Sequence, residues 1–86
     1  MKRLSDIMNK YPNSVDGILI KDIKSIHHVY PINSFVRITG KCDKSAYIEA
    51  YKCHNLYYGW LYNSCDKRYY CHVLRANEFK FYSNIL

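Results

Sequence analysis

The chain has 86 residues, which is enough for one hydrophobic core and excludes a second. Hydrophobic residues make up 49% of the chain, and this share excludes an intrinsically disordered protein. A net charge of +6, spread along the chain without a basic tail, favours anionic partners such as nucleic acid or an acidic protein surface. The same charge is also typical of a basic protein whose charges only keep it dispersed.

Two features of the sequence bear on where the protein acts. No apolar run reaches the ~18 residues of a transmembrane helix, and the basic start MKRLSDIMNKYP lacks the apolar stretch of a signal peptide. We therefore expect a cytoplasmic protein with reduced thiols and no membrane contact. Phe, Tyr, Met, Ile, Asn and Lys, the amino acids of AT-rich codons, form close to half of the chain. This bias is common in phages, viruses and AT-rich bacteria, and for a viral protein the expected compartment is the host cytoplasm. The bias also raises the Tyr and Lys content without a functional demand.

Residues 1–30 predict a short helix and a first strand. The apolar residues of 3–11 recur at helical spacing, namely Leu4, Ile7, Met8 and Tyr11, and Pro12 ends this helix. Residues 17–24 alternate like a strand, although the spacing of Leu19, Ile23 and Ile26 also fits a helix. We favour the strand for 17–24.

Beyond Pro31, β-branched and aromatic residues recur in segments separated by turn clusters about every ten residues, which is typical of a meander. The predicted strands are 34–40, 46–52, 56–62, 68–75 and 78–83. A helix beginning at Ser45 is the alternative for the second segment, since Ala, Glu and Lys favour helices, but Tyr, Ile and Cys favour the strand. The predicted fold is one domain over 1–86, mainly β (α+β): a short N-terminal helix followed by a five-stranded antiparallel meander in 34–83. Its strand number resembles that of small SH3-like or OB-type barrels.

Alternation along these strands sorts the side chains into two faces. One face is small and apolar and is the predicted core; it includes Val36, Ile38, Leu61, Tyr69, Cys71, Val73, Phe79 and Phe81. The other mixes rings with cations and is the predicted binding face; its proposed contact residues are Arg37, Tyr47, Tyr58, Trp60, Arg68, Tyr70 and Lys80. If the N-terminal helix docks over this second face, several of its rings become ordinary residues at the rim of the core.

The cysteines and histidines do not predict a metal site. No C-x₂-C pair is present, and the neighbours in Cys53-His54 and Cys71-His72 would point to opposite faces of a strand. Cys42 and Cys65 fall at the same end of the predicted meander, where an oxidising environment would allow one disulfide. Cys71 is most simply a small core residue, and His27-His28 a solvated pair.

The sequence also argues against an enzyme. Its seven acidic residues form no clustered pair that could serve in acid–base or metal-dependent hydrolysis. Its three glycines are scattered and form no phosphate-binding loop. No cysteine has both a base and a third group to orient that base. We therefore expect a non-enzymatic binding module without cofactors. The favoured ligand is nucleic acid, preferably single-stranded, with rings stacking on bases and Arg37, Arg68 and Lys80 meeting phosphates. The alternative is a protein-binding module, such as a phage or viral inhibitor that grips an acidic surface of a host protein. Unpaired edge strands would also allow a homodimer.

Overall fold

The computed structural model describes residues 3–84 and contains two short helices and seven strands within them. In chain order the elements are α1 (Leu4–Lys10), β1 (Val15–Leu19), β2 (Ile23–Lys24), β3 (Val29–Tyr30), β4 (Phe35–Cys42), α2 (Ser45–Tyr51), β5 (Leu56–Asn63), β6 (Arg68–Arg75), a 3₁₀ turn (Ala76–Glu78), β7 (Phe79–Phe81) and a last 3₁₀ turn (Tyr82–Asn84). The helix predicted over 3–11 is confirmed as α1. Neither helix within 3–84 has the length and apolarity that crossing a bilayer requires.

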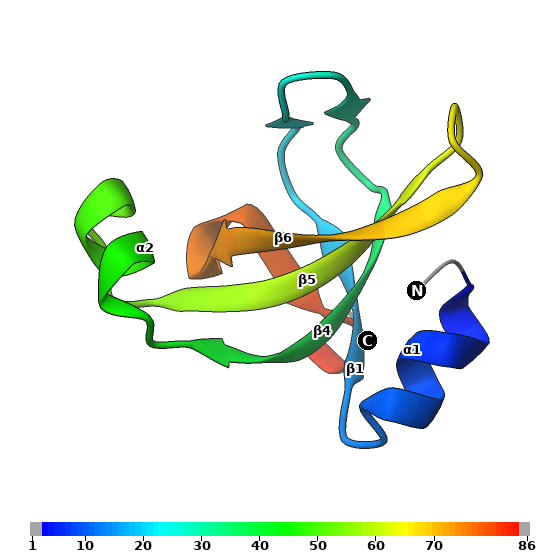
Figure 1. Cartoon of the computed structure of the whole chain (residues 1–86), viewed down its shortest axis with the longest axis horizontal. Helices are drawn as coiled ribbons and strands as arrows, with labels where there is room; N and C mark the ends of the chain where they lie inside the picture. The colour runs from blue at the N-terminus through cyan, green and yellow to red at the C-terminus, as the bar shows by residue number, and fades with distance from the viewer. Residues whose placement is uncertain (1–2, 85–86) are drawn as a thin grey trace.

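The main sheet is open, antiparallel and five-stranded, with the strand order β6-β5-β4-β1-β7 (Figure 1). The predicted class, mainly β with a five-stranded antiparallel sheet, is therefore confirmed. The predicted meander over 34–83 holds only for β4, β5 and β6, because β7 pairs with β1 instead of β6. Gly17 permits this pairing, since a Cβ there would lie 2.9 Å from the carbonyl oxygen of Lys80 on β7.

The strand predicted over 17–24 is divided in the structure. β1 begins earlier, at Val15, and ends at Leu19, and the chain then bends into the separate two-stranded hairpin of β2 and β3. The Asp22 carboxylate accepts a hydrogen bond of 2.7 Å from the backbone N–H of Ile32, which joins the two ends of this connection. The hairpin stands above one end of the main sheet, beside the turn between β5 and β6 (Figure 1).

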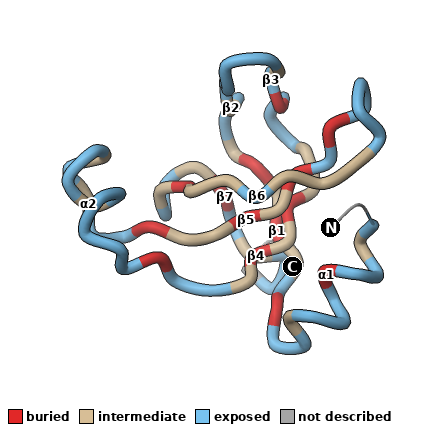
Figure 2. The backbone as a smooth tube through the Cα atoms, viewed as in Figure 1, coloured by how far each residue is buried: buried red, intermediate tan, exposed pale blue. Residues whose placement is uncertain are grey.

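The strand predicted over 46–52 is wrong, because Ser45–Tyr51 form the helix α2. Ala46, Glu49 and Ala50 have good helix propensity, and no neighbouring strand is available to stabilise an extended segment here. Lys52 ends the helix in the left-handed conformation, with φ of 53°. None of the α2 residues is buried (Figure 2), so the helix extends from the end of the sheet without covering its centre.

The core lies on one face of the sheet, and its position in β4 and β5 agrees with the predicted alternation. Val36, Leu61 and Leu74 are at most 1% exposed and belong to a cluster that also contains Leu19, Tyr30, Ile38 and Phe79. In β6 the predicted face is wrong by one residue. Residues 64–67 form a four-residue turn closed by the pair Asn63↔Arg68, so odd positions of β5 face even positions of β6. Cys71 is therefore exposed and is not a core residue.

Candidate nucleic-acid interface

The predicted binding face is partly occupied by the N-terminal segment. Ile7 of α1 is completely buried, and the ring of Tyr11, directly after α1, has its centroid 6.5 Å from that of Trp60. The indole N–H of Trp60 is buried without a hydrogen-bond partner among the described residues. Trp60 is thus packed beneath this segment, as expected for a ring at the rim of a core.

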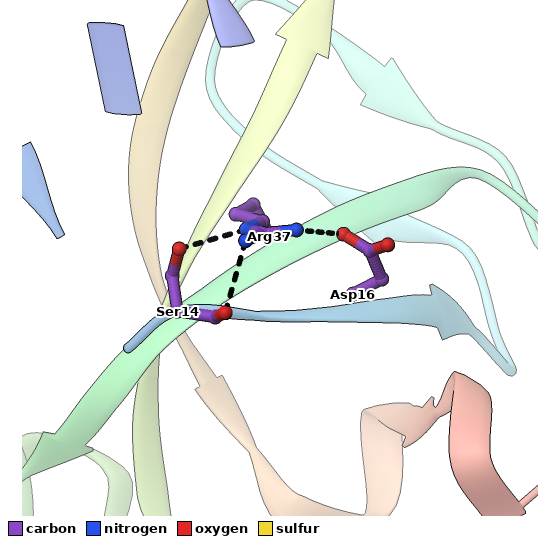
Figure 3. Close-up of polar contacts among 3 residues, drawn as sticks. All are labelled: Ser14, Asp16 and Arg37. Atoms are coloured by element: carbon purple, nitrogen blue, oxygen red, sulfur yellow. Dashed lines mark hydrogen bonds and ion pairs between the residues drawn. The ribbon is translucent and has the colours of Figure 1, made fainter. Parts of the chain in front are cut away.

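Arg37 is held by the loop that leads into β1 (Figure 3). Its guanidinium donates to the hydroxyl of Ser14 at 2.7 Å and to the Ser14 carbonyl at 3.0 Å, and it forms an ion pair with Asp16. Only 12% of the Arg37 side chain is exposed. Each of its three nitrogens donates one hydrogen bond within the protein, so Arg37 joins the β1 segment to β4. Because its side chain is also nearly covered, it has little capacity left for an external phosphate.

Tyr47 and Tyr58 lie towards the α2 end of the molecule. Tyr47 is on α2 and is 39% exposed, with its ring centroid 6.4 Å from that of Tyr51. The Cys42 side chain, through a hydrogen bond, raises the pKa of Tyr58 to about 12. Both residues therefore lie at the opposite end of β5 from the β5–β6 turn.

The remaining predicted residues fall in different places. Lys80 is exposed on the short edge strand β7, and Arg68 begins β6 next to the turn. Tyr70 pairs with Leu61 across the sheet, so it lies on the opposite face from Trp60. The seven predicted residues therefore do not form one surface. Arg37 pairs with Trp60 beside the N-terminal segment, Tyr47 and Tyr58 lie towards α2, and Arg68 and Tyr70 lie together at the β5–β6 turn.

A hollow of about 300 Å³, here called the hairpin pocket, opens where Tyr70 lies. Its walls come from the β2–β3 hairpin on one side and from β6 and the β5–β6 turn on the other. They include Ser25, His28, Tyr30, Asp66, Tyr70 and His72. Segments that are far apart in the sequence thus place five rings around one cavity, those of His27, His28, Tyr30, Tyr70 and His72.

Three of these rings form a continuous edge-to-face series. The centroid of Tyr30 lies 4.7 Å from that of His28 and 4.9 Å from that of His72. The Tyr30 hydroxyl is 3.1 Å from Nε2 of His72, within hydrogen-bond distance. Burial, and then the nearby His28, lowers the pKa of His72 below 6.5, which favours the neutral imidazole at pH 7. Tyr30 is 2% exposed and forms the floor of the pocket, and burial raises the pKa of its hydroxyl.

The β5–β6 turn is built around two side chains that accept hydrogen bonds. Oδ1 of Asn63 accepts the backbone N–H groups of Cys65 at 2.9 Å and Asp66 at 3.1 Å, which fixes the start of the turn. The Tyr70 hydroxyl donates a 2.6 Å hydrogen bond to Oδ2 of Asp66, and this bond raises the pKa of Tyr70. The turn then passes through Lys67, whose φ is 55°, before β6 begins.

A second hollow, here called the tyrosine pocket, lies beside the β5–β6 hairpin and encloses about 340 Å³. Its walls include Tyr62 and Tyr69, a cross-strand pair whose ring centroids are 5.2 Å apart. Tyr62 is 46% exposed. Tyr30 contributes to the walls of both pockets, so the two hollows adjoin the same buried ring.

Basic side chains lie at the turn of the β5–β6 hairpin. Lys67 is exposed and Arg68 is partly exposed, and Lys24 is exposed on β2. Within residues 3–84, no three His, Cys, Asp or Glu side chains gather in a way that could hold a metal ion. All four cysteines are free thiols, and Cys42 and Cys65 lie near opposite ends of β5 and not, as predicted, at the same end.

Sequence reasoning missed His28, Tyr30, Tyr62, Asp66, Tyr69 and His72 as parts of a site. A partial signal was present, because His27-His28 and Tyr30 precede a proline within a long connection, where ligand-contacting residues are common. Nothing in the spacing, however, places that connection against β6. Comparisons with protein-family models, with curated proteins and with solved structures find no match to this chain.

Proposed function

We propose that the protein is a non-enzymatic binding module for single-stranded nucleic acid, and that the strand contacts the β5–β6 hairpin. One observation carries this proposal: the hairpin pocket and the tyrosine pocket both lie beside the β5–β6 hairpin, and the turn of this hairpin is followed by the cations Lys67 and Arg68. Bases stack on aromatic rings with ~1–3 kcal/mol each, and basic side chains follow the phosphates. The net charge of +6 supports an anionic ligand.

The two pockets suit neighbouring bases of one strand. Tyr62 and Tyr69 offer exposed ring surface in one pocket, and His28 and Tyr70 line the other. Tyr30 borders both pockets. A single-stranded nucleic acid that runs past the β5–β6 turn would therefore pass from one set of rings to the other. Lys67 and Arg68 lie at this tip, where the phosphates of such a strand would run.

Replacing Arg68 with alanine is expected to weaken binding to all single-stranded sequences alike. One lost phosphate contact lowers the slope of log affinity against log salt concentration by about one. The measurement is the fluorescence anisotropy of a labelled oligonucleotide titrated with the protein at several salt concentrations. Lys44→Ala removes an exposed cation near α2 and should leave the slope unchanged. Wild-type affinity that stays constant between about 50 and 200 mM salt would refute the proposed function.

A protein-binding module, such as a phage or viral inhibitor of a host protein, is the second candidate, and the topology favours it. We interpret the strand order, the hairpin within the β1–β4 connection and the 3₁₀ turn before β7 as SH3-like. SH3 domains bind extended peptides in aromatic-lined grooves, although fold alone does not carry function. A pull-down after nuclease treatment separates the candidates: one stoichiometric acidic protein retained with unchanged yield would favour this second function, and loss of every partner would favour nucleic acid.

A further inference from the structure

The hairpin pocket combines aromatic walls with one carboxylate, that of Asp66. This acid stands out in a chain with a net charge of +6, and it lies directly before the cations Lys67 and Arg68. A carboxylate repels phosphate, so the pocket itself is a poor place for the backbone of a nucleic acid. Its aromatic walls and its carboxylate instead suit the base of a nucleotide, which is flat and can donate hydrogen bonds.

Two hydrogen bonds position Asp66, one to its carboxylate and one from its backbone. The Tyr70 hydroxyl donates to Oδ2, and the backbone N–H of Asp66 is bound by Asn63. Oδ1 accepts no side-chain or backbone hydrogen bond from the described part of the chain, so an oriented acceptor remains for a ligand. The other titratable rings that line the pocket are His28, His27, Tyr30 and His72, and the pKa of His72 is lowered.

We propose that the hairpin pocket selects bases that carry an exocyclic amino group, through a hydrogen bond from that group to Asp66. The inference rests on the proposed function and adds its base preference. Cytosine and adenine present an amino group on their hydrogen-bonding edges, whereas thymine presents a carbonyl oxygen at the corresponding position. Uracil carries the same carbonyl, and its single ring N–H lies between two carbonyl oxygens that a carboxylate repels. The volume of about 300 Å³ is at the small end of ligand pockets, which suits one base better than a whole nucleotide.

Tyr70 acts in this selection as a positioning residue. Its hydroxyl fixes the carboxylate, while its ring lines the pocket. Tyr70→Phe keeps the ring and removes the hydroxyl, so it should reduce the discrimination between bases more than it reduces the affinity for the preferred base.

The test compares oligodeoxycytidylate with oligodeoxyuridylate, because the two differ in the base edge and share size and backbone. At neutral pH and fixed salt, the wild-type protein should bind the cytosine strand roughly tenfold more tightly. Asp66→Asn should bring the two affinities within about twofold of each other, and it should strengthen uridylate binding because a negative charge near the phosphates is lost. Asp43→Asn removes an exposed acid between β4 and α2 and should retain the wild-type preference.

The outcomes separate this inference from the function on which it rests. Equal affinity of the wild-type protein for both strands, or a preference that survives in Asp66→Asn, overturns the base selection while salt-dependent binding still supports the proposed function. No binding to either strand overturns both. Thermal unfolding followed by circular dichroism verifies that each variant is folded.

Discussion

Replacing Leu61 with alanine is expected to lower the free energy of unfolding by about 2–5 kcal/mol, the usual range for a buried leucine whose loss leaves a cavity. Leu61 is completely buried in the centre of β5 and faces Val36 on β4 and Tyr70 on β6. Urea unfolding, followed by circular dichroism, measures the change.

The matched control for this substitution is Ile26→Ala. Ile26 is 92% exposed at the tip of the β2–β3 hairpin, so its removal should change the stability by less than about 0.5 kcal/mol. A loss of stability in Leu61→Ala no larger than that in Ile26→Ala would contradict the placement of the core.

Replacing Tyr62 and Tyr69 together with alanine is expected to weaken oligonucleotide binding about ten- to a hundredfold. One base stacked on this pair is worth ~1–3 kcal/mol, and each 1.4 kcal/mol changes affinity by a factor of ten. The fold should persist, because a cross-strand pair contributes only about 0.2–1 kcal/mol to a sheet. The measurement is the dissociation constant from anisotropy, with stability checked in parallel.

Two single variants define where the stacking occurs. Tyr82→Ala removes a ring that is 44% exposed after β7, and Tyr47→Ala removes one that is 39% exposed on α2. Both should bind like the wild-type protein. If Tyr47→Ala weakens binding and the Tyr62, Tyr69 double variant does not, the ligand contacts the α2 end of the sheet.

Local patterns predicted much of the secondary structure. The helical spacing of Leu4, Ile7 and Met8 located α1, and the alternating rings of 56–62 and 68–75 located β5 and β6 within a residue of their observed ends. These elements can be recognised in the sequence because the residues that share a face recur at helical spacing in α1 and at every second position in β5 and β6. The helix α2 lacks such a face, since none of its residues is buried, and its mixed propensities therefore gave the wrong prediction.

The site depended on information that a single sequence does not contain. Which residues of β6 face the core is set by the length of the turn at 64–67, and a difference of one residue moves Tyr70 and His72 to the face of Leu61. The docking of α1 beside Trp60 and the ion pair of Arg37 are long-range contacts that alternation does not reveal. The charge and aromatic content did favour an anionic, ring-stacking ligand, and this remains the proposal.

The most direct measurement of the central claim is a titration of the isotopically labelled protein with oligodeoxycytidylate, followed by backbone amide chemical shifts in NMR. We predict that the largest shifts occur in residues 62–72 and 24–30, which surround the two pockets, and that α2 and the α1 side of the sheet change little. Shifts concentrated around Trp60 and α2, or no shifts at a saturating concentration of the oligonucleotide, would contradict it.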